Sequence, residues 1–422
     1  MNGRAGGNRM GIAMALLWLL AALLVNEWTV ARGLSPAHLG PRARALLRAL
    51  DVALVAWALA GLRFRRADAV KNLNVLLLSL VALLAGVTVL VQRVPRVLGY
   101  EFASGVWSRY STRPDGIYYE DPVLRMNFML PNYRTEMYYN AYTWTHQTDA
   151  LGFRNPRTMT EADVILLGDS FIYGHGVEID QTVGRALERL TPYSVVNLAR
   201  QGDCALQEAY LLTRHIERFR PRHVVYFYYR NDILDLFVYR TPAELAAFVY
   251  TPLEAIRYPE PLEVATAVKL RDEQNAEHAR LDPFRYQLSR RIHLFQLPIW
   301  LAQRARRWRL AMQLATWGEE QDGESLGWRY TKKAILYMDR LARAHGAQFV
   351  MAPIVLGDHR QREILESFAR SHGIAFVDTR ELSRDLAGPN FLPHDGHFSP
   401  AGAETMAQLV AGHLEEAARR VR

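Results

Sequence analysis

The sequence contains very little cysteine: Cys204 is the only one among its 422 residues. A single thiol excludes an intrachain disulfide and argues against a cysteine-based metal site. The excess of one charge sign is also small, with 51 basic residues against 43 acidic ones. Because the basic residues are densest beside apolar segments, we interpret them as charges that flank a membrane, and we do not expect nucleic acid as a partner.

The first hundred residues carry long runs without charge, at 10–26 and 72–92. A helix needs about 20 apolar residues to cross the hydrocarbon core of a bilayer. The second run meets this length, whereas the first is slightly short and is also compatible with a signal peptide. The second long apolar run so soon afterwards favours an uncleaved span. A shorter apolar stretch at 51–62 is a candidate third span. We therefore predict that residues 1–99 form a membrane anchor of two or three transmembrane helices.

The distribution of basic residues bears on the orientation of this anchor. With three spans and the N-terminus inside, six lysines and arginines lie on each side, so the positive-inside rule does not choose. With two spans, the loop at 32–71 lies inside and carries eight of them against four outside. This second topology puts the rest of the chain outside the cytoplasm. We expect an inner or plasma membrane protein with a periplasmic C-terminal domain.

After a lead-in at 100–161 with short extended segments at 126–133 and 142–149, the sequence from 162 alternates apolar runs with helical patterns. Such alternation predicts a parallel sheet with helices on both faces, here within 162–422. The strands are expected at 162–168, 193–199, 223–229, 348–355 and 374–379, and the helices at 181–191, 206–219, 330–346, 359–372 and from about 400. The charged and aromatic segment at 233–328 predicts a helical insertion that either packs or forms a lid or substrate wall.

The stretch LLGDSFIYGHGV, 166–177, ends a predicted strand in Gly-Asp-Ser. We expect Gly168 to allow a sharp turn, which places Ser170 where a strand stops and a helix begins. Ligands bind at that end of the strands in open parallel sheets. The alternative is that Ser170 is only a helix N-cap and that Asp169 is structural.

Three further stretches follow strands or precede the last helix: NLARQGDC at 197–204, YYRND at 228–232 and LPHDGHFSPAG at 392–402. Together with GDS, and in this order, they resemble the SGNH hydrolases, or GDSL-like esterases, over about residues 162–420. The segment TDALGFRN, 148–155, resembles the lead-in of membrane-anchored relatives. The resemblance implies a flavodoxin-like three-layer α/β/α domain with a parallel sheet, placed here after the transmembrane helices.

The chemistry of such a site explains the residue types. A serine hydroxyl is a weak nucleophile until a base removes its proton, and His397 is the natural base for Ser170. Asp395 is the candidate carboxylate that orients the imidazole. By resemblance, the oxyanion that forms during attack is bound by the backbone N–H groups of Ser170 and Gly202 and by the side-chain amide of Asn231.

The spacing of the aspartate and the histidine departs from the family pattern. The family usually has Asp-x-x-His, whereas this chain has Asp-Gly-His, so Asp395 either orients His397 or leaves a Ser170–His397 dyad. The alginate O-acetylation proteins also have an Asp-x-His pair, but there it precedes the serine. We expect Asp169 to be structural. Four other polar residues are either at the pocket rim or solvated in loops: His175, Arg200, Asp203 and Arg230.

These features predict a membrane-anchored serine esterase that hydrolyses ester-linked acyl groups, with an acetylated envelope or secreted glycan as the expected substrate. An O-acyltransferase that acylates a polysaccharide would use the same residues, because water and a sugar hydroxyl compete for one acyl-enzyme. A catalytically silent envelope-assembly module is the third alternative. No metal or organic cofactor is implied, because the histidines lack the spacing of metal ligands.

Overall fold

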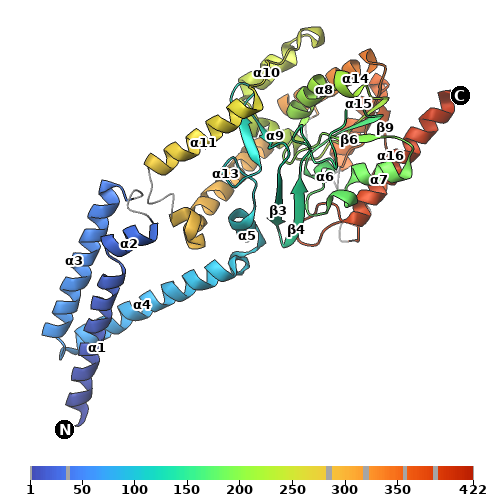
Figure 1. Ribbon diagram of the computed structural model, residues 1–422. Coiled ribbons are helices and arrows are strands. Elements are labelled where there is room, and N and C mark those ends of the chain that lie inside the picture. The colour runs from blue at the N-terminus through green and yellow to red at the C-terminus, as the bar shows by residue number, and fades with distance from the viewer. Residues whose placement is uncertain are drawn as a thin grey trace. The chain divides into compact units, whose positions relative to one another are not determined.

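The computed structural model describes residues 2–34, 39–281, 288–316, 323–354, 359–383 and 388–421. The gaps include 35–38 of the predicted anchor, 282–287 and 317–322 of the predicted insertion, and the last position of the predicted strand 348–355. The chain forms two compact units, one of Met1–Val106 with Asp272–Ala302 and the other of Trp107–Arg271 with Gln303–Arg422. Figure 1 gives the element labels that are used below.

The first unit is helical. Helices α3 and α4 are each long and apolar enough to cross a membrane, whereas the apolar part of α1, Arg9–Leu24, is shorter. Helices α1 and α3 pack side by side (Figure 1). The bounds are α1 Asn2–Leu24, α2 Glu27–Leu34, α3 Pro41–Arg63 and α4 Asp68–Arg93, followed by α5 Tyr100–Trp107. The predicted short span at 51–62 is therefore part of a 23-residue helix. A helix of spanning length thus lies within 32–71, the segment that the two-span topology leaves as a loop.

A buried asparagine joins three of these helices. Oδ1 of Asn74 in α4 accepts hydrogen bonds from the indole N–H groups of Trp18 in α1, at 2.8 Å, and Trp57 in α3, at 2.9 Å. A buried polar side chain in apolar surroundings is stable only when it is hydrogen-bonded. Asn74 therefore favours one arrangement of α1, α3 and α4 over others.

The second unit begins with two antiparallel hairpins, which contain the extended segments predicted at 126–133 and 142–149. The first pairs β1 Tyr118–Asp121 with β2 Met126–Met129, and the second pairs β3 Arg134–Tyr139 with β4 Tyr142–Gln147. Met129, Met137 and Trp144 are buried in the same apolar core as the central sheet. The hairpins are thus packed into the domain that follows them.

The central sheet has five parallel strands in the order β6-β5-β7-β8-β9, as the alternating pattern predicted. In chain order this arrangement is 2-1-3-4-5, the flavodoxin-like order. The strands are β5 Val164–Leu167, β6 Val195–Asn197, β7 His223–Tyr226, β8 Gln348–Met351 and β9 Ala375–Phe376. Each lies inside its predicted range and is shorter than it. Strands β6 and β7 flank β5, so the loops after these three strands meet at one edge.

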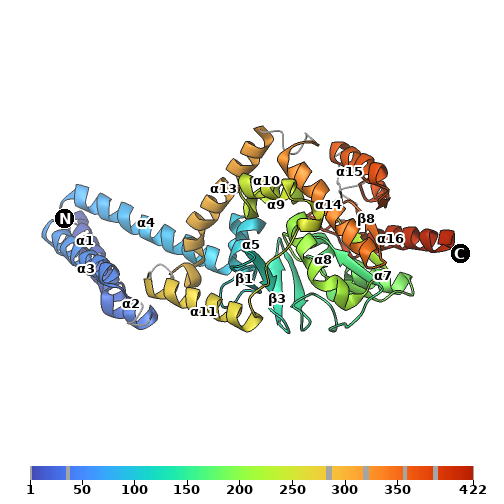
Figure 2. The ribbon, with the colours of Figure 1, turned by 90° about the horizontal axis from the view of Figure 1, so that it is seen from above.

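Helices cover both faces of the sheet, which confirms the three-layer α/β/α architecture. Ile165 and Leu167 of β5 share one core with α8, α14 and α15, whereas Val164 and Leu166 share the other core with α7 and α16. Helices α8 and α14 pack against each other, as do α7 and α16 (Figure 2). The bounds are α7 Val183–Leu190, α8 Ala205–Phe219, α14 Leu326–Ala344, α15 His359–His372 and α16 Pro400–Val421.

Between β7 and β8, the described residues of 233–328 are mainly helical, with an irregular stretch at 256–263. The helices are α9 Asp232–Tyr239, α10 Pro242–Tyr250, α11 Val264–Leu281 and α13 Leu297–Thr316. Short 3-10 turns occur at Pro95–Leu98, Ile179–Gln181, Leu253–Ala255, His293–Gln296 and Arg380–Ser383. Helix α9 starts at Asp232, the last residue of the YYRND motif, so this motif lies at the junction of strand and insertion.

Candidate active site

The turn after β5 presents the predicted nucleophile. Ser170 is the first residue of the short helix α6, Ser170–Tyr173, and it is partly exposed. A Cβ on Gly168 would lie 2.7 Å from the Ile172 side chain and 3.2 Å from that of Phe227. Gly168 does not have a left-handed backbone. The expectation of a special turn conformation is therefore wrong, and glycine is required here because the helix and the next strand approach so closely.

Asp169, and not Ser170, is the N-cap of this helix. Its Oδ1 accepts a hydrogen bond from the backbone N–H of Phe171 at 3.0 Å, and its Oδ2 lies 3.4 Å from the Ser170 hydroxyl oxygen. The alternative that Ser170 serves only as a cap is thus wrong. Burial raises the pKa of Asp169 to about 6. The structural role expected of Asp169 fits this geometry.

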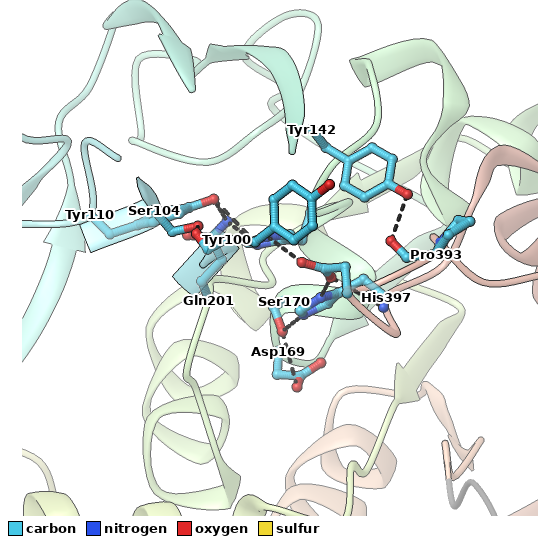
Figure 3. Close-up of polar contacts among 11 residues, drawn as sticks. Tyr100, Ser104, Tyr110, Tyr142, Asp169, Ser170, Gln201, Pro393 and His397 are labelled. Atoms are coloured by element: carbon cyan, nitrogen blue, oxygen red, sulfur yellow. Dashed lines mark hydrogen bonds and ion pairs between the residues drawn. The ribbon is translucent and has the colours of Figure 1, made fainter. Parts of the chain in front are cut away.

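Ser170, His397 and Asp395 are hydrogen-bonded in series, and Figure 3 shows the contact between Ser170 and His397. The Ser170 Oγ lies 2.8 Å from His397 Nε2, and the His397 Nδ1 contacts Asp395 Oδ1. The Asp395 side chain is fully buried, whereas that of His397 is 19% exposed. Gly396 has a φ of 86°, a conformation that favours glycine, and it reverses the chain between the two side chains. The Asp-Gly-His spacing therefore allows the aspartate to reach the ring.

The two remaining oxyanion candidates lie after the strands that flank β5. Gly202 follows β6 with a φ of 74°, and its carbonyl accepts a hydrogen bond from the Tyr239 hydroxyl at 3.0 Å. Asn231 precedes α9, and its Nδ2 donates to Asp235 Oδ2 at 2.6 Å. The order of the strands brings both residues to the edge of the sheet that holds Ser170. Since the Asn231 amide has two N–H bonds, one remains for a second acceptor.

Several buried acidic residues lie on the segments that follow β6 and β7. Burial, together with the charge of Asp169, raises the pKa of Asp235 to about 7. Burial also raises the pKa of Asp203 to about 6 and the pKa values of Glu208 and Asp232 well above their ordinary range. The raised pKa values favour the protonated, neutral form of these carboxyl groups. Each charged carboxylate also makes its neighbours harder to ionise.

The loop after β6 is held by a buried ion pair. Arg200 Nε lies 2.8 Å from Asp203 Oδ2, and Arg200 Nη1 donates to the Asn127 carbonyl of β2 at 2.7 Å. Both charged side chains are almost fully buried, so they lie neither at a pocket rim nor in a solvated loop. Arg230, by contrast, is exposed. The ion pair fixes the ends of the short segment that contains Gly202.

His175 was expected at the rim or in solvent, but it is buried against His397. Its ring stacks on that of His397, with 4.1 Å between the centroids and 17° between the planes. The neighbouring Gly174 and Gly176 have φ values of 85° and 81°. A Cβ on Gly176 would lie 2.4 Å from the Leu392 side chain. The two glycines that flank His175 are the sequence feature from which this close packing could have been inferred.

The second hairpin supports the loops of the site. The Tyr142 hydroxyl of β4 donates to the Pro393 carbonyl at 2.7 Å, in the loop that carries Asp395 and His397 (Figure 3). The buried guanidinium of Arg154 donates to four carbonyl oxygens, those of Thr145, Tyr173, Gly174 and Val177. Both contacts connect residues before the first parallel strand to the active-site loops.

One group of side chains in the described part of the chain has the composition of a metal site. Ligand atoms of His175, Asp395 and His397 lie within 4.8 Å of one another. However, the two imidazole rings are stacked nearly parallel, so their in-plane lone pairs do not converge on one point. The His397 nitrogens also already contact Ser170 and Asp395. This arrangement suits proton transfer better than metal binding.

Solved structures that resemble the chain include TesA, with 16% sequence identity over 60% of this chain and 98% of that protein and a TM-score of 0.35. They also include a G-D-S-L family protein from Desulfitobacterium hafniense described as lipolytic, with 13% identity over 60% of this chain and 99% of that protein and a TM-score of 0.33. No protein-family model matches the chain, and no curated protein matches it. Because the similarity is so low, an activity has to be argued from the residues of the site.

Proposed function

We propose that the chain is a membrane-anchored serine esterase that hydrolyses ester-linked acyl groups. The observation that carries this proposal is the hydrogen-bonded series from Ser170 through His397 to Asp395. A hydroxyl, an imidazole and a buried carboxylate in this order form the arrangement that activates a serine for acyl transfer. The partial exposure of Ser170 leaves its hydroxyl accessible to a substrate.

In the first half of the reaction, His397 Nε2 accepts the proton as Ser170 Oγ attacks the ester carbonyl carbon. The Asp395 carboxylate accepts the Nδ1–H of the imidazolium and stabilises its charge. The oxyanion lies toward the N–H groups of Ser170 and Gly202 and the free N–H of Asn231. The tetrahedral intermediate then releases the alcohol, which takes the proton from His397, and leaves an acyl-Ser170 ester.

In the second half, a water molecule replaces the alcohol. His397 removes a proton from this water as its oxygen attacks the acyl carbonyl, and it returns the proton to Ser170 Oγ as the carboxylic acid leaves. A sugar hydroxyl in place of water would give acyl transfer. The partition between the two acceptors decides between an esterase and an O-acyltransferase.

The setting of the reaction follows from the anchor. Because Asn74 ties α1 to α3 and α4, we propose three transmembrane helices, although only α3 and α4 reach full spanning length. Arg4 and Arg9 precede the apolar part of α1 and favour an inside N-terminus, since the first helix usually dominates orientation. Three crossings then place the catalytic unit outside the cytoplasm, where envelope or secreted glycans carry acyl groups. An acetylated glycan is the proposed substrate.

The decisive experiment uses the full-length protein in detergent with an activated aryl acetate, with and without an added oligosaccharide. Mass spectrometry of free acetate and of the oligosaccharide separates hydrolysis from transfer. Release of acetate that requires Ser170 supports the esterase, and acetylated sugar as the main product replaces it with the transferase. An absence of both products with several acyl esters would favour a silent assembly module.

A further inference from the structure

The structure points to His175 as a positioning residue that holds Asp395 in place for His397. This inference rests on the proposed esterase function and extends its hydrogen-bonded series by one group. The Nε2 atom of His175 lies 3.8 Å from Oδ2 of Asp395, the oxygen that does not contact His397. Both atoms are buried, and neither has a hydrogen-bond partner among the described residues. A donor and an acceptor that are both buried and unsatisfied cost stability unless they pair with each other.

The tautomer of His175 gives Nε2 the proton that such a bond needs. The Tyr118 hydroxyl donates to Gln201 Oε1 at 3.4 Å, which turns the Gln201 amide nitrogen toward His175 Nδ1 at 3.1 Å. The Tyr110 hydroxyl also lies 3.3 Å from Nδ1. Because Nδ1 faces two donors, it is the acceptor, and a neutral imidazole then carries its single proton on Nε2.

The surroundings keep this imidazole neutral. Burial lowers the pKa of His175 well below its ordinary value, and the positive charges of His397 and Arg154 lower it further. His175 therefore remains a neutral donor when His397 becomes an imidazolium during the reaction. A second imidazolium beside the first would compete for the same carboxylate, and the stacked geometry excludes it on electrostatic grounds.

The ring is held in a fixed orientation by aromatic neighbours. Tyr139 meets it edge-to-face with 4.7 Å between the centroids, and Trp144 lies at 4.8 Å. The His397 ring stacks on it with 4.1 Å between the centroids. Because the ring cannot turn away, a small rotation of the carboxylate is enough to shorten the 3.8 Å separation to hydrogen-bond length. Catalytic hydrogen bonds are often long before the substrate binds.

This contact supplies what the short Asp-Gly-His spacing lacks. With one residue between them, Asp395 and His397 lie in a tight turn, and Oδ1 contacts both the ring Nδ1 and, at 3.3 Å, the backbone N–H of His397. Asp395 Oδ2 has no hydrogen-bond partner in the part of the chain that the structure describes. A neutral N–H from His175 restrains the carboxylate from the other side, so that it stays in the orientation that accepts the Nδ1 proton.

Two amide variants test this role, because they differ only in how far the amide nitrogen extends from the backbone. In His175→Gln the amide nitrogen extends about as far as Nε2, whereas in His175→Asn it stops near the position of Nδ1. We expect His175→Asn to lower kcat on an aryl acetate about 10- to 100-fold, the effect of losing a hydrogen bond to a charged group. His175→Gln should retain most of the activity. KM should change little in either variant, because His175 does not touch the substrate.

A double-mutant cycle shows whether His175 acts through Asp395. In an Asp395→Asn background, His175→Asn should cost less than about threefold, because the carboxylate it holds is gone. His215→Phe, which changes a histidine in α8 that packs on Phe153 and Phe219, serves as a control for the loss of an inner histidine and should leave kcat unchanged. Thermal melting of each variant in detergent checks the fold.

The outcomes separate this inference from the proposed function. Equal loss in the asparagine and glutamine variants, or the same loss with and without the Asp395 carboxylate, would overturn the positioning role while leaving an active Ser170 esterase. Wild-type kcat in His175→Asn would overturn it as well. Full turnover in Ser170→Ala, by contrast, would remove the esterase itself.

Discussion

The Ser170 hydroxyl and the His397 Nε2 lie 2.8 Å apart although 227 positions separate the two residues in the chain. The fold brings them together because β5 ends at the edge of the sheet where the loop before α16 returns. Ser170→Ala removes the attacking oxygen and should lower kcat on an aryl acetate at least about 10⁴-fold. The melting temperature should stay near the wild-type value, since Asp169 provides the helix cap. An organophosphonate should label Ser170, and labelling of another serine would contradict the mechanism.

The contact between Asp395 and His397 predicts a graded pair of variants. His397→Ala should be nearly as damaging as loss of Ser170, because the two act as one unit. Asp395→Asn should cost between about tenfold and 10⁴-fold in kcat, since the amide no longer orients and stabilises the imidazolium. Rates over a range of pH on one ester decide this. An unchanged profile for Asp395→Asn would reduce the series to a Ser170–His397 dyad.

One amide N–H of Asn231 donates to Asp235, and the second N–H is available to the oxyanion. Asn231→Ala should therefore lower kcat about 100- to 1000-fold with little change in KM, the usual effect of losing one oxyanion donor. Asn231→Asp is the matched variant, because it keeps the shape but replaces the donor with an oxygen. Equal activity in wild type and Asn231→Ala would exclude this residue from the oxyanion site.

Burial raises the pKa of Asp235 to about 7, which makes its contribution to stability depend on pH. A raised pKa means that the folded protein holds the proton more tightly, so this contribution is complete below about pH 4 and is lost as the pH rises through 7. An asparagine at this position cannot ionise, so Asp235→Asn removes the loss of stability at high pH. It also keeps an oxygen that can accept from the Asn231 amide. Its melting temperature relative to wild type should rise between pH 5 and pH 8. A difference that is constant across this range would contradict the assignment.

The buried Cys204 gives the full chain a clean background for a topology experiment. A membrane-impermeant maleimide should label Glu161→Cys in intact cells, because Glu161 is exposed in the catalytic unit that we place outside. Arg66→Cys, in the loop between α3 and α4, should react only after the membrane is permeabilised. The opposite pattern would put the catalytic unit in the cytoplasm.

The strands and the Ser170–His397–Asp395 series were predictable because their signals are local. Each buried parallel strand is a short continuous apolar run, and the Asp-Gly-His motif lies within three positions. The place of His175 was not predictable in this way. Its ring is buried by Tyr139 and Trp144, and the packing of that hairpin against the loop after α6 is a tertiary contact without a periodic pattern.

Two smaller errors have physical causes as well. Gly168 was interpreted through backbone conformation, but the structure requires glycine for the approach of Ile172 and Phe227, which depends on the packing of β5 against its neighbour. The bond from Asn231 to Asp235 spans four positions at the start of α9. It follows from helical geometry once the helix is known to begin at 232, whereas the sequence places this boundary only approximately.

The four hydrogen bonds of Arg154 have a consequence for where a truncated form of this chain can begin. A soluble fragment that starts at the first strand of the parallel sheet, near 162, would remove the guanidinium and leave the carbonyls of Gly174 and Val177 buried without donors. It would also remove Tyr142 and Trp144, which support the loops beside Ser170. A soluble form of the second unit should therefore start near Trp107, so that it keeps both hairpins together with Ser170.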